Sequence, residues 1–211
     1  MRKILLIFIL TSLVMSVTSC YGVAVIRKDG PYEGRIIDAD TGQPIEGVVV
    51  LGEWSTEIIT PGGATHNFYN AQETVTDKNG EFSIEGLGLK ILSNVTPMDV
   101  LIFKAGYEYI GMGPWKGLKY RGWKGNEESY DPVLKTKVIK PVYDPKKKIK
   151  WEGNKAIIPL KKLTMEERRK NIPPLPSGEA PYKKIKLMLN EYNKNSKELG
   201  LGIIDVWRDM R

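Results

Sequence analysis

Side chains that could perform catalysis are few in this chain. Its 211 residues include one histidine, His66, and one cysteine, Cys20. A catalytic zinc ion takes about three protein ligands, usually histidines and a carboxylate, and leaves one position for water. One histidine cannot supply that set, and no Gly-x-Ser-x-Gly elbow is present for a serine triad. We therefore expect no catalytic residues, no metal site and no cofactor. A hydrolase with two facing carboxylates stays open, because a sequence does not reveal which acids meet in space.

Aromatic rings are better candidates for a binding site. The stretch between Tyr107 and Lys155 is rich in tryptophan and tyrosine, interleaved with lysine, arginine and glycine. Such rings can stack on sugars, and neighbouring cations can hold anionic groups. They could instead cover the edge of a core, since aromatic residues dominate packing in small folds. The candidate ligand-binding residues are Trp115, Tyr120, Trp123 and Trp151.

Cys20 stands at the end of an N-terminal export signal. Arg2 and Lys3 precede an apolar run that is too short for a comfortable membrane span of about 20 residues. Val17-Thr18-Ser19-Cys20 resembles the lipobox of bacterial lipoproteins, whose cysteine receives diacylglycerol on sulfur before the signal is removed. The resemblance implies that residues 1–20 are a lipoprotein signal peptide and that Cys20 carries the lipid. An ordinary secretory signal and an uncleaved anchor are the alternatives.

The lipoprotein resemblance also indicates a location. Tyr21 follows the cysteine, whereas aspartate at that place marks inner-membrane retention in well-studied lipoproteins. The expected location is therefore an exported protein at a bacterial membrane, the outer membrane in particular. With no second cysteine, the exported chain can form no internal disulfide and must fold by burying apolar surface.

The part of the chain that follows the signal is mildly basic. The signal holds two of the 32 basic residues and none of the 25 acidic ones, so the remaining 191 residues carry 30 − 25 = +5. The excess gathers in residues 146–150 and 161–170, which could touch anionic headgroups or acidic polymers but are more typical of solvated faces. No nucleic-acid recognition motif is present, so we expect no nucleic-acid partner.

Strand patterns follow the signal and a short tether over residues 21–30. β-Branched runs flank turn sequences, and Asn79-Gly80 between alternating apolar residues predicts a hairpin. Pro159 cannot donate to a strand ladder, which places the last strand at a sheet edge. Residues 53–71, which contain His66, read as an exposed loop. The expected strands are 32–39, 45–51, 73–76, 81–84, 100–105 and 156–160.

The order of these pieces resembles the carboxypeptidase regulatory-like domain. The matching segments are Gly34–Asp38 with Thr41–Val48, Thr76–Phe82, and Lys104–Tyr107. The resemblance implies a transthyretin-like (prealbumin-like), seven-stranded antiparallel β-sandwich over residues 31–163, with an aromatic-rich insertion at about 107–154. It also implies a noncatalytic accessory module, because this domain usually accompanies other activities.

Helices are expected only near the C-terminus, in a helical tail over residues 164–211. Thr164 and Glu167 have the spacing of a capping box, and a longer helix follows Pro181. One face of that helix is apolar, and we expect it to pack on the sandwich, with docking on a partner protein as the alternative. The apolar stripe consists of Ile185, Met188, Leu189, Tyr192 and Leu199.

Together these patterns predict a lipid-anchored, noncatalytic lipoprotein of the cell envelope. Its expected role is structural or protein-interacting, with a protein partner in the envelope. The alternative is a carbohydrate-binding module that uses the aromatic insertion to hold a polysaccharide. A hydrolase with an unrecognised carboxylate site is a third and weaker hypothesis.

Overall fold

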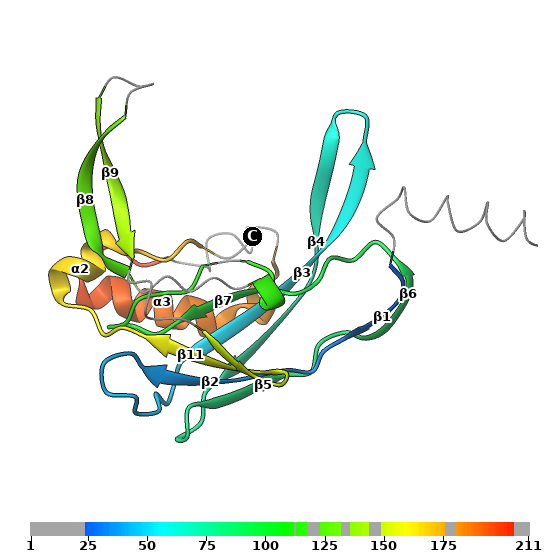
Figure 1. The fold of residues 1–211 in the computed structure, drawn as a ribbon, viewed down its shortest axis with the longest axis horizontal. Coiled ribbons are helices and arrows are strands. Elements are labelled where there is room, and N and C mark those ends of the chain that lie inside the picture. Colours follow the sequence, from blue (N-terminus) through cyan, green and yellow to red (C-terminus); the bar gives the residue numbers. More distant parts are fainter. Residues whose placement is uncertain are drawn as a thin grey trace, which may run out of the picture.

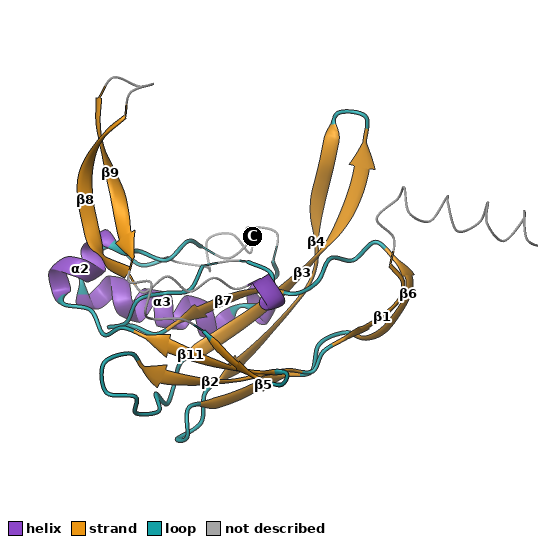
Figure 2. Ribbon diagram, viewed as in Figure 1, coloured by secondary structure: helices purple, strands orange, loops and turns teal. Residues whose placement is uncertain are grey.

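A computed structural model describes residues 24–111, 113–117, 123–131, 136–143, 149–175 and 180–204; for residues 24, 25, 117, 123–131 and 136–143 it describes the backbone alone. This part of the chain is mainly β, with helices only in short turns and near the C-terminus (Figure 2). The fold class expected from the sequence is confirmed at that level. Among the described residues, no helix has the length and apolar character needed to cross a membrane. Cys20 and Tyr120 lie outside the described residues.

Two facing sheets form the body of the molecule (Figure 1). The four-stranded sheet has the order β10 (Lys150–Glu152), β11 (Lys155–Leu160), β2 (Tyr32–Asp38), β5 (Glu81–Ile84). The three-stranded sheet has the order β4 (Gly63–Val75), β3 (Val49–Thr60), β7 (Asp99–Phe103). Two separate ribbons pair β1 (Ala24–Asp29) with β6 (Gly88–Ser93), and β8 (Trp123–Asp131) with β9 (Thr136–Tyr143). The helices are η1 (Trp115–Gly117), α2 (Met165–Lys170), η2 (Tyr182–Lys184) and α3 (Lys186–Glu198).

The core between the sheets follows from alternation along the strands. Ile36, Phe82 and Ile158 of the four-stranded sheet pack in one buried cluster with Val50 and Ile102 of the three-stranded sheet. The residues between them in β3 and β7 point to the opposite face, and they are buried as well. Both strands therefore read as continuous apolar runs, because both of their faces are covered.

The cover on the outer face of β3 and β7 is α3. Its apolar stripe behaves as predicted: Met188 and Leu189 lie in a buried cluster with Leu51 and Phe103. The Glu73 carboxylate of β4 accepts hydrogen bonds from the backbone N–H groups at the start of α3, at 2.7 and 2.9 Å. Sheet, sheet and helix thus form three layers, and the C-terminal segment is part of the fold.

The shorter helix α2 also confirms its sequence signal. Thr164 and Glu167 form the reciprocal capping box, with the Glu167 carboxylate on the Thr164 N–H at 2.9 Å. The helix is joined to α3 by a buried side-chain contact. The Arg168 guanidinium donates to Asn195 Oδ1 at 2.6 Å and pairs with Glu198.

The predicted hairpin at Asn79-Gly80 is wrong, although its turn is present. Asp77 Oδ1 accepts from the N–H groups of Asn79 and Glu81, both at 2.8 Å, as the turn sequence predicts. The strands on either side then separate, since β4 pairs with β3 and β5 pairs with β2. The turn is a corner between sheets. The turn at residues 40–44 likewise leads from β2 in one sheet to β3 in the other.

Residues 53–71 are not the loop that the sequence suggested. β3 and β4 continue through them as a two-stranded ribbon that projects beyond the sheet (Figure 1). Their β-branched residues favour extended backbone, and the chain reverses near Pro61. His66 stands on this ribbon opposite Glu57, at 4.0 Å from its carboxylate, and more than half of its side chain is exposed.

The edge position expected for the last strand is also wrong, as is the expectation of wholly antiparallel sheets. β11 lies between β10 and β2, and its pairing with β2 is parallel. Pro159 is tolerated for a local reason. The backbone O of Leu160 accepts a hydrogen bond from Ala39 N and therefore points toward β2. Because successive residues of a strand point to opposite sides, the nitrogen of Pro159 points away from β2. On that side β10 pairs only as far as Ile157, so no described strand needs a donor from Pro159.

Residues 24–29, expected as part of a tether, form β1 and belong to the fold. They pair in antiparallel register with β6, and Asp29 at the end of β1 is 2% exposed. The buried Asp29 carboxylate accepts three hydrogen bonds and so holds the chain in place just before β2, the first strand of the sandwich. The tether prediction is therefore corrected over this range.

Candidate functional site

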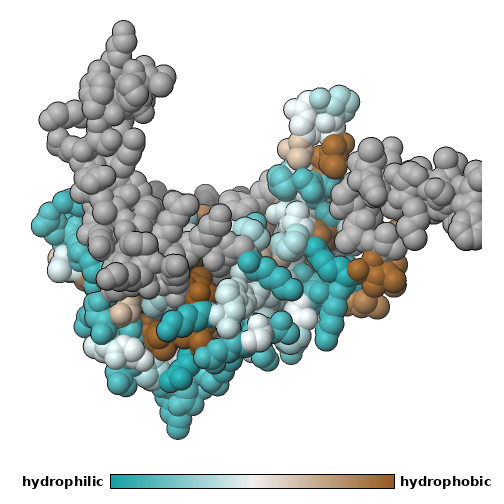
Figure 3. Space-filling view, viewed as in Figure 1, coloured by the Kyte–Doolittle hydropathy of each residue, from teal (hydrophilic) through white to brown (hydrophobic). Residues whose placement is uncertain are grey.

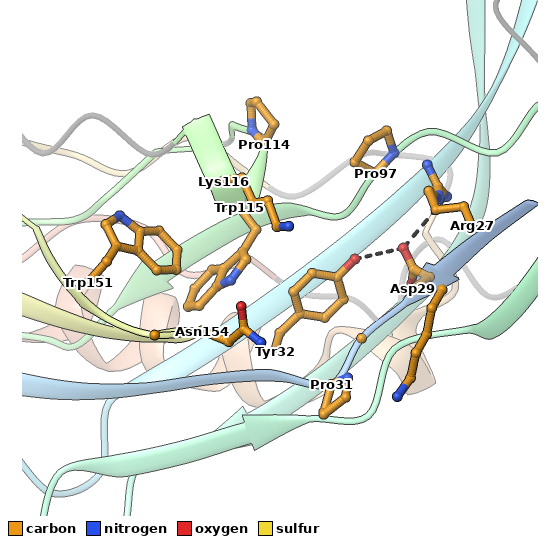
Figure 4. Close-up of a pocket in the computed structure, with 13 residues that line it drawn as sticks. Arg27, Asp29, Pro31, Tyr32, Pro97, Pro114, Trp115, Lys116, Trp151 and Asn154 are labelled. Atoms are coloured by element: carbon orange, nitrogen blue, oxygen red, sulfur yellow. Dashed lines mark hydrogen bonds and ion pairs between the residues drawn. The ribbon is translucent and has the colours of Figure 1, made fainter. Parts of the chain in front are cut away.

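A pocket of about 720 Å³ opens where β1 meets the sandwich (Figure 4). Its walls come from segments that are far apart in sequence: the end of β1 and start of β2, Pro97, η1, and the β10–β11 turn. The walls join two of the four aromatic candidates, Trp115 and Trp151. Tyr120 is outside the described residues, and nothing is described of the Trp123 side chain.

Trp115 is the buried floor of this pocket. Only 3% of it is exposed, and it makes edge-on contacts with Tyr32, Phe82 and Trp151 at centroid distances of 6.0, 5.9 and 5.4 Å. Trp115 is therefore a core residue, in line with the alternative that these aromatic rings cover the edge of a core. η1 places it there, with Trp115 N–H donating to Met98 O at 2.9 Å.

Trp151 remains available to a ligand. It is 40% exposed, projects from β10, and stands at 85° to the Trp115 ring. The two rings are not coplanar, so they do not make a flat double platform. Instead the two rings meet edge to face, and both line the pocket (Figure 4). A ring-shaped ligand could stack on Trp151.

Asp29 organises the opposite end of the pocket. Its carboxylate accepts from the Tyr32 hydroxyl at 2.6 Å, from Trp54 Nε1 at 2.8 Å and from the Leu87 N–H at 3.0 Å. Burial and the hydrogen bond to Asp29 raise the pKa of Tyr32 well above its ordinary range. This carboxylate is thus fully engaged in structure, and the phenol stays protonated.

Three cations line the same pocket. Arg27, Lys28 and Lys116 line the pocket, and Asp29 is the one acid among the lining residues, so the charge there is 3 − 1 = +2. Arg27 donates from Nη2 to Thr96 O at 3.1 Å and lies 3.6 Å from Asp29. Its Nε is buried and has no hydrogen-bond partner among the described residues. A buried donor of this kind usually has a hydrogen-bond partner.

Metal chemistry finds no support in the described ranges, where no group of three His, Cys, Asp or Glu side chains could hold an ion. The pocket instead combines an exposed indole with cations.

Four of the charged and aromatic pocket residues were missed from the sequence: Arg27, Lys28, Asp29 and Tyr32. The tether interpretation hid Arg27, Lys28 and Asp29, because residues 24–29 are three apolar residues followed by three charged ones and do not show the alternation of a half-buried strand. Nothing in the sequence linked them to the tryptophans, because β2 and η1 meet only through the three-dimensional fold.

Comparison with known proteins does not assign a family. The sequence matches no protein-family model and no curated protein. Among solved structures, the chain is similar to the pilus adhesin RrgA from Streptococcus pneumoniae, with 12% identity and a TM-score of 0.33 over 65% of this chain and 15% of the adhesin. A 9R-lipoxygenase from Cyanothece PCC8801 matches with 13% identity and a TM-score of 0.22, over 72% of this chain and 20% of the enzyme. The chain thus spans a small part of each structure, and these likenesses are too low to carry an argument.

Proposed function

We propose that this chain is a lipid-anchored, noncatalytic binding module of the bacterial cell envelope. The export signal and the position of Cys20 support the anchor. The four-stranded and three-stranded sheets, facing each other over one core, support a transthyretin-like sandwich of the carboxypeptidase regulatory-like kind. The single acid in the pocket is tied to three donors, which favours binding over acid–base catalysis there.

The ligand that this pocket suits is an acidic saccharide of the envelope. The observation that carries this proposal is the half-exposed Trp151 in a pocket that three cations line. An indole face stacks on a sugar ring, and guanidinium and ammonium groups hold carboxylate or phosphate substituents. Of the functions expected from the sequence, the carbohydrate-binding alternative therefore has the more specific support.

Titration of tryptophan fluorescence with acidic and neutral oligosaccharides tests this proposal. We expect an acidic ligand to bind and Trp151→Ala to weaken its binding about tenfold, the factor that corresponds to about 1.4 kcal/mol of lost ring contact. Tyr69→Ala is the matched control, because Tyr69 is a similarly exposed aromatic on the β3–β4 ribbon. Equal effects of the two substitutions, or equal affinity for neutral sugars, would contradict the proposal.

The anchor has a separate test. Mass spectrometry of the N-terminal peptide from membrane-extracted protein should show an acylated Cys20 and no residue before it. Cys20→Ala should abolish that modification. An unmodified Cys20 in native protein would remove the anchor from the proposal and leave the pocket untouched.

A protein partner in the envelope is the second candidate function. The β3–β4 ribbon projects from the body and exposes Ile58 and Ile59, at 46% and 58%. Projecting strands offer unpaired backbone groups to another chain. The C-terminal stripe, in contrast, is buried against the sheet. Crosslinking in membranes should therefore capture a partner with native protein but not with Ile58→Asp/Ile59→Asp. Equal capture would exclude this ribbon as the docking surface.

A further inference from the structure

The β1–β6 ribbon has one apolar face that nothing in the described structure covers. In the antiparallel register Ile26 stands opposite Ile91 and Lys28 opposite Leu89, so these four side chains share a face. Ile26, Leu89 and Ile91 are 68%, 64% and 61% exposed. Large aliphatic residues gathered at such exposure on one small ribbon indicate a contact surface rather than scattered surface residues.

The opposite face of the ribbon turns toward the body of the molecule. Arg27 donates to Thr96 O, and Lys90 Nζ lies 3.4 Å from the Tyr69 hydroxyl and 5.2 Å from the centre of its ring. These contacts fix the orientation of the ribbon, so its apolar face points outward. In Figure 3, brown residues gather at the end of the molecule where β1 and β6 lie.

A strained residue lies in the same ribbon. Leu92 in β6 has φ of 47° and is 67% exposed. Positive φ is unfavourable for a residue with a branched side chain, and strain of this kind gathers at functional sites. No burial of the leucine side chain compensates for it in the free molecule.

The charges on the ribbon fit an anionic surface. Arg27 and Lys90 turn toward the body of the molecule, and the one acid of the two strands, Asp29, is buried. Lys28 is exposed on the apolar face. Aliphatic side chains beside lysine are typical of segments that lie at the headgroup boundary, where apolar burial and attraction to anionic lipid act together.

The position of the ribbon in the chain decides the occupant. β1 begins at Ala24, four residues after Cys20. Four consecutive Cα–Cα steps of about 3.8 Å span at most about 15 Å. We propose that the β1–β6 ribbon lies on the membrane itself, with Ile26, Leu89 and Ile91 in the headgroup and acyl boundary. The proposal rests on the lipidation of Cys20 proposed above, which would hold this ribbon against the bilayer.

Depth-dependent quenching tests this arrangement in the full-length protein. A lipidated Cys20 leaves no free thiol, so Ile91→Cys can carry a single bimane label, and Ser83→Cys on the exposed side of β5 is the matched control. Each protein is reconstituted into vesicles of phosphatidylethanolamine and phosphatidylglycerol that contain nitroxide-labelled lipid. We expect the label at residue 91 to shift to the blue and to be quenched at least about twofold more than the label at residue 83, since interfacial residues lie about 5–10 Å deep. Lys28→Glu should reduce the difference.

The outcomes separate the ribbon from its anchor. Acylated, vesicle-bound protein with equal quenching at residues 91 and 83 would overturn the ribbon proposal and keep the anchor. Quenching at residue 91 in a Cys20→Ala background, which leaves a single thiol, together with an unmodified Cys20 in the native protein, would keep the ribbon and overturn the anchor. An unmodified protein that stays off vesicles would overturn both. Excimer formation between pyrene labels at residue 91, without lipid quenching, would assign the face to a second copy of the chain and refute the membrane assignment.

Discussion

Asp29 shows how one residue ties three parts of the chain together. Through its carboxylate, the end of β1 is bonded to Tyr32 of β2, to Trp54 of β3 and to the backbone before β6. All of these donors lose their acceptor if the carboxylate is removed. A buried donor without a partner costs the full desolvation penalty, which makes this position sensitive.

Asp29→Ala is therefore expected to lower the free energy of unfolding by about 3 kcal/mol, as in other cases where one member of a buried polar cluster is removed. Denaturant unfolding measures the change. Glu85→Ala, at an exposed acid nearby, should stay within about 0.5 kcal/mol. A loss below about 1 kcal/mol for Asp29→Ala would show that water or rearrangement replaces the carboxylate.

Tyr32 predicts a dependence of stability on pH. Burial and the bond to Asp29 raise the pKa of its phenol in the folded protein, while the unfolded value stays near 10. The stability that this phenol contributes is complete below pH 10 and is lost as the pH rises toward the folded pKa. Unfolding curves of the native protein and Tyr32→Phe should differ by a constant amount from pH 6 to about 9, and the difference should shrink above about pH 10. A constant difference up to pH 11 would contradict the raised pKa.

At the scale of elements, local patterns were more predictable than strand partners. The capping box of α2 and the turn at Asp77 form as the sequence indicated, because both depend on neighbours within four residues. The pairing of β5 with β2 could not be predicted, since the same turn residues serve a hairpin and a corner between sheets. β11 illustrates the same limit: its parallel partner is more than a hundred residues earlier in the sequence.

For the site residues too, composition was visible in the sequence, whereas their spatial neighbours were not. The aromatic composition singled out Trp115 and Trp151, and only the fold distinguishes the buried Trp115 from the partly exposed Trp151. Arg27 and Asp29 gave no chemical signal of their own, because their role depends on β1 meeting Thr96 and Trp54.

The corner at Gly80 yields a prediction with an internal control. Gly80 and Gly42 have nearly the same φ, 74° and 72°. A Cβ at Gly80 would lie 2.4 Å from Ile36 O, whereas a Cβ at Gly42 meets nothing within 4 Å. Gly42→Ala should cost about 1 kcal/mol of stability through backbone strain alone, and Gly80→Ala about 3 kcal/mol because backbone must also move. Thermal unfolding of the two variants compares them, and equal losses would refute the close contact.

At the scale of the whole molecule, we expect the stability of the fold to depend on its third layer, helix α3. α3 covers apolar residues of β3 and β7 that would otherwise face water. Met188→Ala should therefore cost about 2–5 kcal/mol, measured by denaturant unfolding, because it leaves a cavity beneath the helix. Leu187→Ala is the neighbouring control, since Leu187 is 39% exposed. Similar small losses at both positions would mean that α3 is only loosely held.

The same layer restricts the use of truncated chains. A chain that ends at Pro181 would lack α3 and expose Val49, Leu51, Leu101 and Phe103 together. We expect it to bind a hydrophobic dye and to lose its cooperative unfolding transition. A cooperative transition in the truncated chain would show that the two sheets are stable without the helix.

Both the parallel partner of β2 and the cover of β3 come from the last third of the chain, and this sets an order in time. The ribosome releases the first strands of the sandwich long before it has made β11 and α3. Until then β2 has an unpaired edge, and β3 and β7 have an uncovered apolar face. Translation must nearly finish before the sandwich can close. The nascent chain therefore exposes this strand edge and this apolar face for most of its synthesis.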